Sequence, residues 1–246
     1  METLWQDIVQ WLHTAGLHVG KSAAAQVGAV VSDGATAVAS KLDMGSLLAL
    51  AAALGWASGF RLYAVVFLVG GLGAIGWMDL PTGLHMLQHP AMLAASGFML
   101  LMEFFADKIP GVDSLWDLVH SVVRIPAGAA LAASVFGADN STMAMVAALM
   151  GGTLAASSQA AKTTTRAAIN TSPEPFSNIA ASLLEDGLVV GAVWLATNHP
   201  LAFGILLTIV VVLMAVVTWV LFKFLRAVFR RVRQWWGGGS GQSVSV

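Results

Sequence analysis

The strongest constraint on the fold is a series of six long apolar segments that hold few charged residues. They lie at roughly 46–76, 91–108, 112–136, 141–168, 177–197 and 200–227. A helix needs about 20 residues to cross a bilayer, and no segment of useful length alternates apolar and polar residues as a strand would. Only 10% of the 246 residues are charged, against about 25% in a soluble domain. We predict an all-α, polytopic membrane helix bundle of about six transmembrane helices.

The cations predict how these helices are oriented. The connections at 77–90, 137–141 and 197–200 contain no Lys or Arg. The opposite side collects Lys21, Lys41, Lys108, Lys162, Arg166, Lys223, Arg226, Arg230, Arg231 and Arg233. Since cytoplasmic flanks are enriched in Lys and Arg, we expect both termini to be cytoplasmic.

We expect three regions: an N-terminal segment at 1–45, the six-helix domain at 46–227, and a tail at 228–246. Residues 1–16 place apolar side chains on one helical face, which predicts a short interfacial helix. Residues 20–42 fit either a second surface helix or a mobile linker. The first residues lack a basic segment, so we expect no cleavable signal peptide. The tail is basic and then Gly/Ser-rich, and its cations suit anionic lipid headgroups.

Several ionisable residues fall inside the apolar segments, where each costs roughly 2.5–3.5 kcal/mol on insertion scales. Glu103 and Asp107 are four residues apart and share a helix face. Asp113, Asp117, His120 and Arg124 follow at spacings of four, three and four, which places them on one stripe of the third segment. Such groups tend to be paired, to face protein or water, and to mark function.

Three of these groups are predicted to share one depth. Counting about 1.5 Å of rise per residue puts Glu103, His120 and Glu185 each roughly 12 Å from the cytoplasmic face. Arg61 and Arg124 then lie deeper in the membrane as counter-charges. Two interpretations stay open: a proton- or ion-binding layer in a pathway, and a structural ion-pair network.

The fourth segment ends with Lys162 and Arg166 beside a polar loop at 170–178. This loop could bind an anion with those two cations, or its residues could simply cap the next helix. Pro126 lies inside the third segment, so we expect a kink near Ile125 and a broken helix close to the ionisable groups.

Enzyme and metal chemistry have weaker support. Asp113, Asp117, His120 and Glu103 could together ligate a metal ion, although no established metal motif is present. His85, His89 and His199 with Asp79 could form a surface zinc site, but Pro90 and Pro200 after histidines are more typical of helix starts. The chain has no Cys, no Walker-type loop and no G-x-S-x-G motif, so we expect neither an ATP-driven pump nor a serine hydrolase.

Several motifs resemble a known family. Residues 104–117 read F-F-A-D-K-I-P-G-V-D-S-L-W-D, and they are joined by R-I-P-A-G-A at 124–129, S-P-E-P at 172–175, Ser177-Asn178, Glu185-Asp186 and S-G-F-R at 58–61. This pattern resembles the bacterial membrane family called domain of unknown function 4126, over roughly residues 46–200. The resemblance implies a multi-span protein of the bacterial inner membrane and brings no activity with it.

The leading hypothesis is a small transporter or channel for an ion or polar solute, rather than an enzyme. Its pathway residues would be Arg61, Glu103, Asp107, Asp113, Asp117, His120, Arg124, Glu185 and Asp186, with Lys162 and Arg166 as anion contacts. We expect no cofactor and no nucleic-acid partner. The alternatives are a membrane-embedded metal-binding protein or enzyme and a non-catalytic membrane scaffold.

Overall fold

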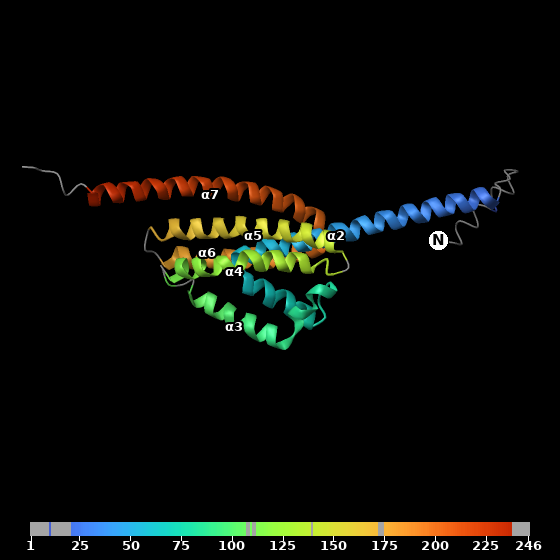
Figure 1. Ribbon diagram of the computed structural model, residues 1–246, viewed down its shortest axis with the longest axis horizontal. Helices are drawn as coiled ribbons and strands as arrows, with labels where there is room; N and C mark the ends of the chain where they lie inside the picture. Colours follow the sequence, from blue (N-terminus) through green and yellow to red (C-terminus); the bar gives the residue numbers. More distant parts are fainter. Residues whose placement is uncertain are drawn as a thin grey trace, which may run out of the picture. The chain divides into compact units, whose positions relative to one another are not determined.

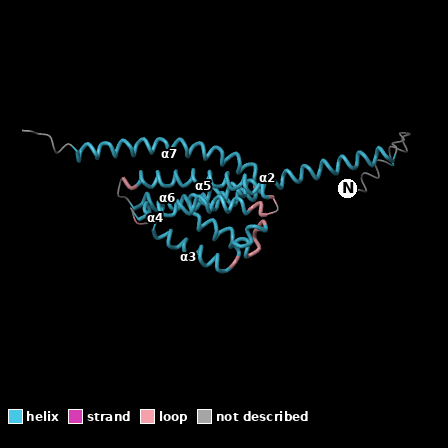
Figure 2. The backbone as a smooth tube through the Cα atoms, viewed as in Figure 1, coloured by secondary structure: helices cyan, strands magenta, loops and turns pink. Residues whose placement is uncertain are grey.

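The computed structural model describes residues 10, 21–106, 109, 112–138, 140–171 and 175–237. Its elements are α2 (Lys21–Ala74), the 3₁₀ helix η1 (Thr82–Gln88), α3 (Pro90–Ala106), α4 (Val112–Ser134), α5 (Ser141–Ile169), α6 (Pro175–Asn198) and α7 (Pro200–Gly237). These described residues contain helices and loops and no strand (Figure 2), which confirms the all-α class.

Part of the predicted N-terminal region falls outside this description. The interfacial helix expected over residues 1–16 lies outside the described residues, apart from residue 10, and so does the tail from residue 238. The segment before the first span, for which a surface helix and a linker both stayed open, is helical and forms the start of α2. The chain divides into two units, Met1–Gly45 and Ser46–Val246, and the site belongs to the second.

Four described helical segments are long and apolar enough to cross a membrane on their own: Met44–Ala74, Ser141–Ile169, Phe176–Asn198 and Pro200–Arg231. A fifth is formed if η1 and α3, which meet at 67°, count as one bent span. α4 has 23 residues, but Asp117, His120 and Arg124 lower its hydropathy. The protein therefore has membrane-spanning helices, whereas the predicted count of six is not confirmed.

The first and last spans differ sharply in their surroundings. Of the residues in the most apolar stretch of Met44–Ala74, 78% are buried within the protein. In the corresponding stretch of Pro200–Arg231 the share of buried residues is 0%. The second unit is therefore built around the Met44–Ala74 part of α2, and α7 contacts α5 and α6 from the outside (Figure 1). Its exposed Leu, Ile, Val and Phe side chains suit lipid rather than water.

Small residues let α2, α4 and α5 approach closely. A Cβ atom on Gly55 of α2 would lie 2.4 Å from the Cα of Gly151 in α5, and a Cβ on Gly128 of α4 would lie 2.8 Å from the Cβ of Ala155. Membrane helices commonly use small residues in this way, because burying apolar surface drives little association in lipid. The close approach brings the polar faces of α4 and α5 against α2.

The helix break that the sequence suggested at Pro126 occurs elsewhere. α4 continues through Pro126 as one helix from Val112 to Ser134. The backbone inside α2 is instead non-helical at Arg61, with φ −146° and ψ 83°. A break frees backbone carbonyls that a regular helix would satisfy, and the carbonyl of Phe60 accepts a hydrogen bond from the Lys162 ammonium at 3.0 Å.

Candidate functional site: a buried ion-pair cluster

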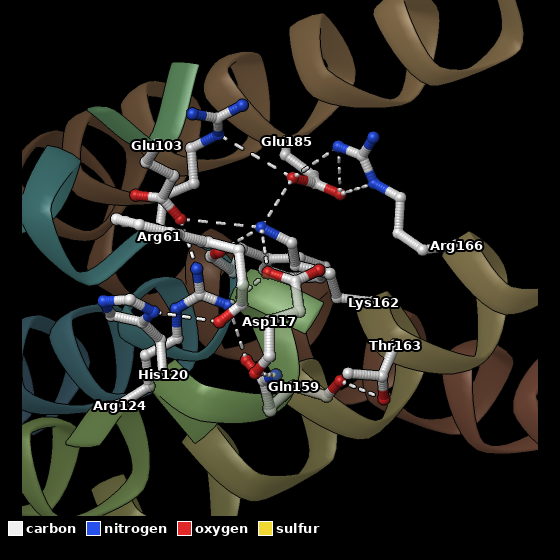
Figure 3. Close-up of polar contacts among 12 residues, drawn as sticks. Arg61, Glu103, Asp117, His120, Arg124, Gln159, Lys162, Thr163, Arg166 and Glu185 are labelled. Atoms are coloured by element: carbon white, nitrogen blue, oxygen red, sulfur yellow. Dashed lines mark hydrogen bonds and ion pairs between the residues drawn. The ribbon is translucent and has the colours of Figure 1, made fainter. Parts of the chain in front are cut away.

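The buried cluster consists of Arg61, Glu103, Asp117, Arg124, Gln159, Lys162, Arg166 and Glu185 (Figure 3), together with Asp186, which pairs with Arg61. These residues are contributed by α2, α3, α4, α5 and α6. All except Asp186 are buried. We refer to this set as the charge cluster. It contains four cations and four carboxylates, so its formal charge is balanced when every group is ionised.

Arg124 organises one half of the charge cluster. Its guanidinium donates to Asp117 at 2.8 Å, to the Gln159 side chain at 3.0 Å, and to Glu103 of α3. Gln159 in turn donates to the backbone carbonyl of Asp117 at 3.1 Å. Asp117, Glu103 and Arg124 are each 0% exposed, so these charges depend on one another for the solvation that water and lipid do not supply.

Lys162 links the two halves. Its ammonium lies 3.1 Å from Asp117, 3.2 Å from Glu185 and 3.6 Å from Glu103. The three carboxylates come from three different helices, α4, α6 and α3. A single flexible, strongly localised positive charge therefore holds these helices together at the break in α2.

Glu185 organises the second half. Arg166 donates to both of its carboxylate oxygens at 3.2 Å and also to Asn178. The Nε of Arg61 lies 3.7 Å from Glu185 and 2.9 Å from Asp186, and Arg61 donates to the Ser182 hydroxyl at 2.5 Å. Three cationic side chains thus face one buried carboxylate.

The carboxylates of Glu103 and Asp117 are incompletely satisfied. Among the described residues, Oε2 of Glu103 and Oδ2 of Asp117 are buried and have no hydrogen-bond partner. A buried acceptor left unpaired costs about 1–3 kcal/mol, and more when it is charged. Both oxygens lie in the part of the charge cluster nearest α3 and α4, so this end can accept a proton or another donor.

His120 lies beside the charge cluster rather than within it. Its ring stacks on Trp116 with centroids 4.1 Å apart and meets the edge of Tyr63 at 5.9 Å. Nδ1 lies 2.9 Å from the Trp116 carbonyl, which can only accept, so Nδ1 carries the hydrogen. Among the described contacts, His120 makes no ion pair with Glu103 or Glu185. The three residues that were predicted to share one depth are therefore not joined through His120.

Some of the other predicted site residues meet in the charge cluster, whereas others lie outside the described part of the chain. Glu103 and Glu185, expected at one depth, are bridged by Lys162, and Asp117 and Arg124 share the expected stripe of α4. Asp107 lies outside the described residues, and so does the side chain of Asp113. Lys162 and Arg166 contact carboxylates of the chain itself; binding of an external anion there stays a prediction.

Sequence reasoning did not assign Gln159, Asn178 and Ser182 to the site. The signal that could have found them is the same helical spacing that singled out α4. Gln159, Lys162 and Arg166 are separated by three and four residues, and so, in reverse order, are Asn178, Ser182 and Glu185. Such spacings form one stripe of a helix, and the two stripes meet in the charge cluster.

Neither predicted metal site is supported by the described residues. Within the described ranges, no set of three or more His, Asp or Glu side chains is placed to hold a metal ion. His85 instead lies 2.9 Å from the Leu80 carbonyl, and His89 accepts from the Ala91 amide at 3.2 Å. His89 thereby caps the start of α3, as expected for a residue that precedes a proline at a helix start.

Comparison with known proteins assigns the chain to a family. Searches of curated proteins and of solved structures found no match. The family model described as "Domain of unknown function (DUF4126)" matches residues 48–220, which contain α3 to α6, most of α7 and the spanning part of α2. These residues supply every member of the charge cluster. The chain therefore belongs to the DUF4126 family.

Proposed function

We propose that this protein is a small integral membrane transporter or channel for an ion or small polar solute, and that the charge cluster is its binding site. The observation that carries the proposal is the position of Lys162, whose ammonium lies within 3.6 Å of carboxylates from three helices. A charge shared in this way can change partners as helices move, which couples solute or proton binding to a change in conformation.

The two unpaired carboxylate oxygens support a pathway over a purely structural network. A network that serves only to hold helices together gains nothing from buried acceptors without donors, because each of them lowers stability. A proton or solute donor that binds Glu103 or Asp117 during the transport cycle would remove this cost. Intramembrane carboxylates of this kind are common in proton relays.

Two pockets are lined by residues on either side of Arg61 in the sequence, and the smaller of them adjoins the charge cluster. One, of about 370 Å³, is lined by Leu62 and Tyr63 together with η1, α3 and α4; another, of about 250 Å³, is lined by Phe60, Lys162 and Glu185 together with α6 and α7. The non-helical residue Arg61 separates Phe60 from Leu62. A rotation of the α2 backbone at Arg61 would change the shape of one pocket relative to that of the other. Broken helices in transporters allow movements of this kind.

The proposed setting is the bacterial inner membrane, with α3 and α4 acting as spans beside the four apolar ones and both termini in the cytoplasm. Support for this orientation comes from the cations near the C-terminal end of α7, Lys223, Arg226, Arg230, Arg231 and Arg233, which mark the side that the positive-inside rule assigns to the cytoplasm. The lipid bilayer, and anionic headgroups at the C-terminal basic residues, are the proposed partners.

A flux assay tests the proposal. Purified protein is reconstituted into liposomes that contain a fluorescent dye selective for the ion under test, and proton, sodium, potassium and chloride gradients are imposed in separate runs. We expect flux of at least one ion above protein-free liposomes, and its loss in Lys162→Met and Glu103→Gln. Lys223→Met is the matched control, because Lys223 lies on α7 over the Trp219 ring, away from the charge cluster.

A second candidate function is a non-catalytic membrane scaffold in which the charge cluster only joins helices. The complete burial of Glu103, Asp117 and Arg124 and the balanced charge favour this candidate. It predicts no flux in the wild type, together with early melting of Glu103→Gln. Absence of flux for all four ions would contradict the transport proposal, whereas wild-type flux lost in a variant that melts normally would contradict the scaffold.

A further inference from the structure

The pocket beside Glu185 combines apolar walls with two charges. It has a volume of about 250 Å³, and its walls include Phe60, Leu184, Leu213, Met214 and Val217. Lys162 and Glu185 are the charged residues that line it, and the α7 residues that close it carry no charge. A bare or hydrated ion would lose hydration against such walls without replacement, so the pocket suits a molecule that is mostly apolar.

The electrostatics around Glu185 favour an anionic group at this position. Arg61 of α2 and Lys162 and Arg166 of α5 all face the Glu185 carboxylate, which is the shared counter-charge of the three. Asp186 pairs with Arg61, whereas Glu103 and Asp117 share Lys162 from the opposite side. A further cation here would meet three positive charges. A ligand carboxylate would meet favourable charge once Glu185 is neutral.

We infer that this pocket binds an apolar monocarboxylate together with one proton on Glu185. The proton adds to a Glu185 carboxylate oxygen and makes a neutral acid. The ligand carboxylate then takes over the ion pair to Lys162 from the pocket, and its hydrocarbon part lies against Phe60, Leu213 and Met214. One anion and one proton enter together, so the charge balance of the cluster is unchanged. This inference rests on the proposed function and names its substrate class.

Octanoate is the probe that tests the inference. Binding of labelled octanoate to the purified full chain in detergent micelles is measured between pH 8 and pH 5, with protein-free micelles subtracted. Because one proton is bound with each anion, we expect affinity to rise as the pH falls, by up to about tenfold per pH unit. Octanol and octyltrimethylammonium should bind at least tenfold more weakly than octanoate at the lower pH.

Variants separate this pocket from other apolar surfaces. Glu185→Gln mimics the neutral side chain, so octanoate binding should persist and lose its pH dependence. Met214→Trp fills the pocket while leaving every residue of the charge cluster in place, and should abolish binding. The matched control is Ile209→Trp, the same enlargement on the exposed surface of α7, which should leave binding intact. Equal binding of octanol and octanoate, or full binding by Met214→Trp, would overturn the inference.

The binding assay and the flux assay can fail separately. Ion flux without octanoate binding would leave the transport proposal standing and remove this substrate class. Octanoate binding with the expected pH dependence, but without flux of any tested ion, would support the pocket and contradict transport of those ions. Since Met214 lies outside the charge cluster, its variant tests the pocket even if Glu185→Gln fails to fold.

Discussion

Replacing Arg124 with Met is the sharpest perturbation of the charge cluster. The substitution keeps an unbranched side chain in α4 and removes one positive charge. It deletes the hydrogen bonds that the guanidinium donates to Asp117, Glu103 and Gln159. Both carboxylates are 0% exposed, so neither can recover its partner from water.

The expected loss follows from these contacts. Hydrogen bonds to charged groups contribute about 1.5–3 kcal/mol each, so the two bonds to carboxylates give about 3–6 kcal/mol. Lys162 remains 3.1 Å from Asp117 and 3.6 Å from Glu103 and compensates part of the loss. We therefore expect Arg124→Met to lower the free energy of unfolding by about 3–5 kcal/mol, the range for a broken buried ion pair.

Equilibrium unfolding in mixed micelles of maltoside and dodecyl sulfate, followed by tryptophan fluorescence and helicity, measures this loss. Arg226→Met is the control, because Arg226 is exposed on α7, and we expect no measurable change from it. Adding Glu103→Gln to Arg124→Met removes one of the stranded carboxylates. The double variant should be more stable than the sum of the single losses by about 1–3 kcal/mol. A loss below about 1 kcal/mol for Arg124→Met, or additive effects of the two changes, would refute this account.

Three further predictions test packing, the histidine and the lipid partner. Gly55→Ala places a Cβ atom 2.4 Å from the Gly151 Cα and should lower the free energy of unfolding by about 1–3 kcal/mol; Gly71→Ala, which meets open space in the same helix, should not lower it. His120→Ala loses a ring stack worth about 0.5–1.5 kcal/mol. In the same unfolding assay it should lower the free energy of unfolding by less than half as much as Arg124→Met does, and an equal loss would place His120 within the charge cluster. Neutralising Arg226 and Arg230 with Gln should weaken retention of anionic lipid by about 1 kcal/mol per charge, measured by lipid exchange in nanodiscs, and retention unchanged from wild type would contradict it.

The helices were largely predictable, because their signals are local. Apolar segments near the length of a bilayer, ended by Gly, Pro and polar clusters, predicted the boundaries of α3 to α6 within two residues of those observed. The charge stripe of α4 followed from its spacing in the same way, and the Arg124–Asp117 pair confirms it. The polar residues of α4 also explain why fewer apolar spans are found than the six predicted. The residues that place α4 in the site make this helix less apolar than a typical span.

The amino-acid sequence by itself determined an all-helical membrane protein, its family, and the polar stripes of its helices, because hydropathy and helical periodicity act over a few turns of one chain segment. Only the tertiary structure decided which stripes meet. Lys162 and Arg166 looked like loop-side cations, yet close packing of α2 on α5 buries Lys162 between carboxylates from three other helices. The tertiary structure also places the helix break at Arg61 rather than at Pro126. Four cations and four carboxylates have many possible pairings, and the sequence carries no distance between helices that would select one.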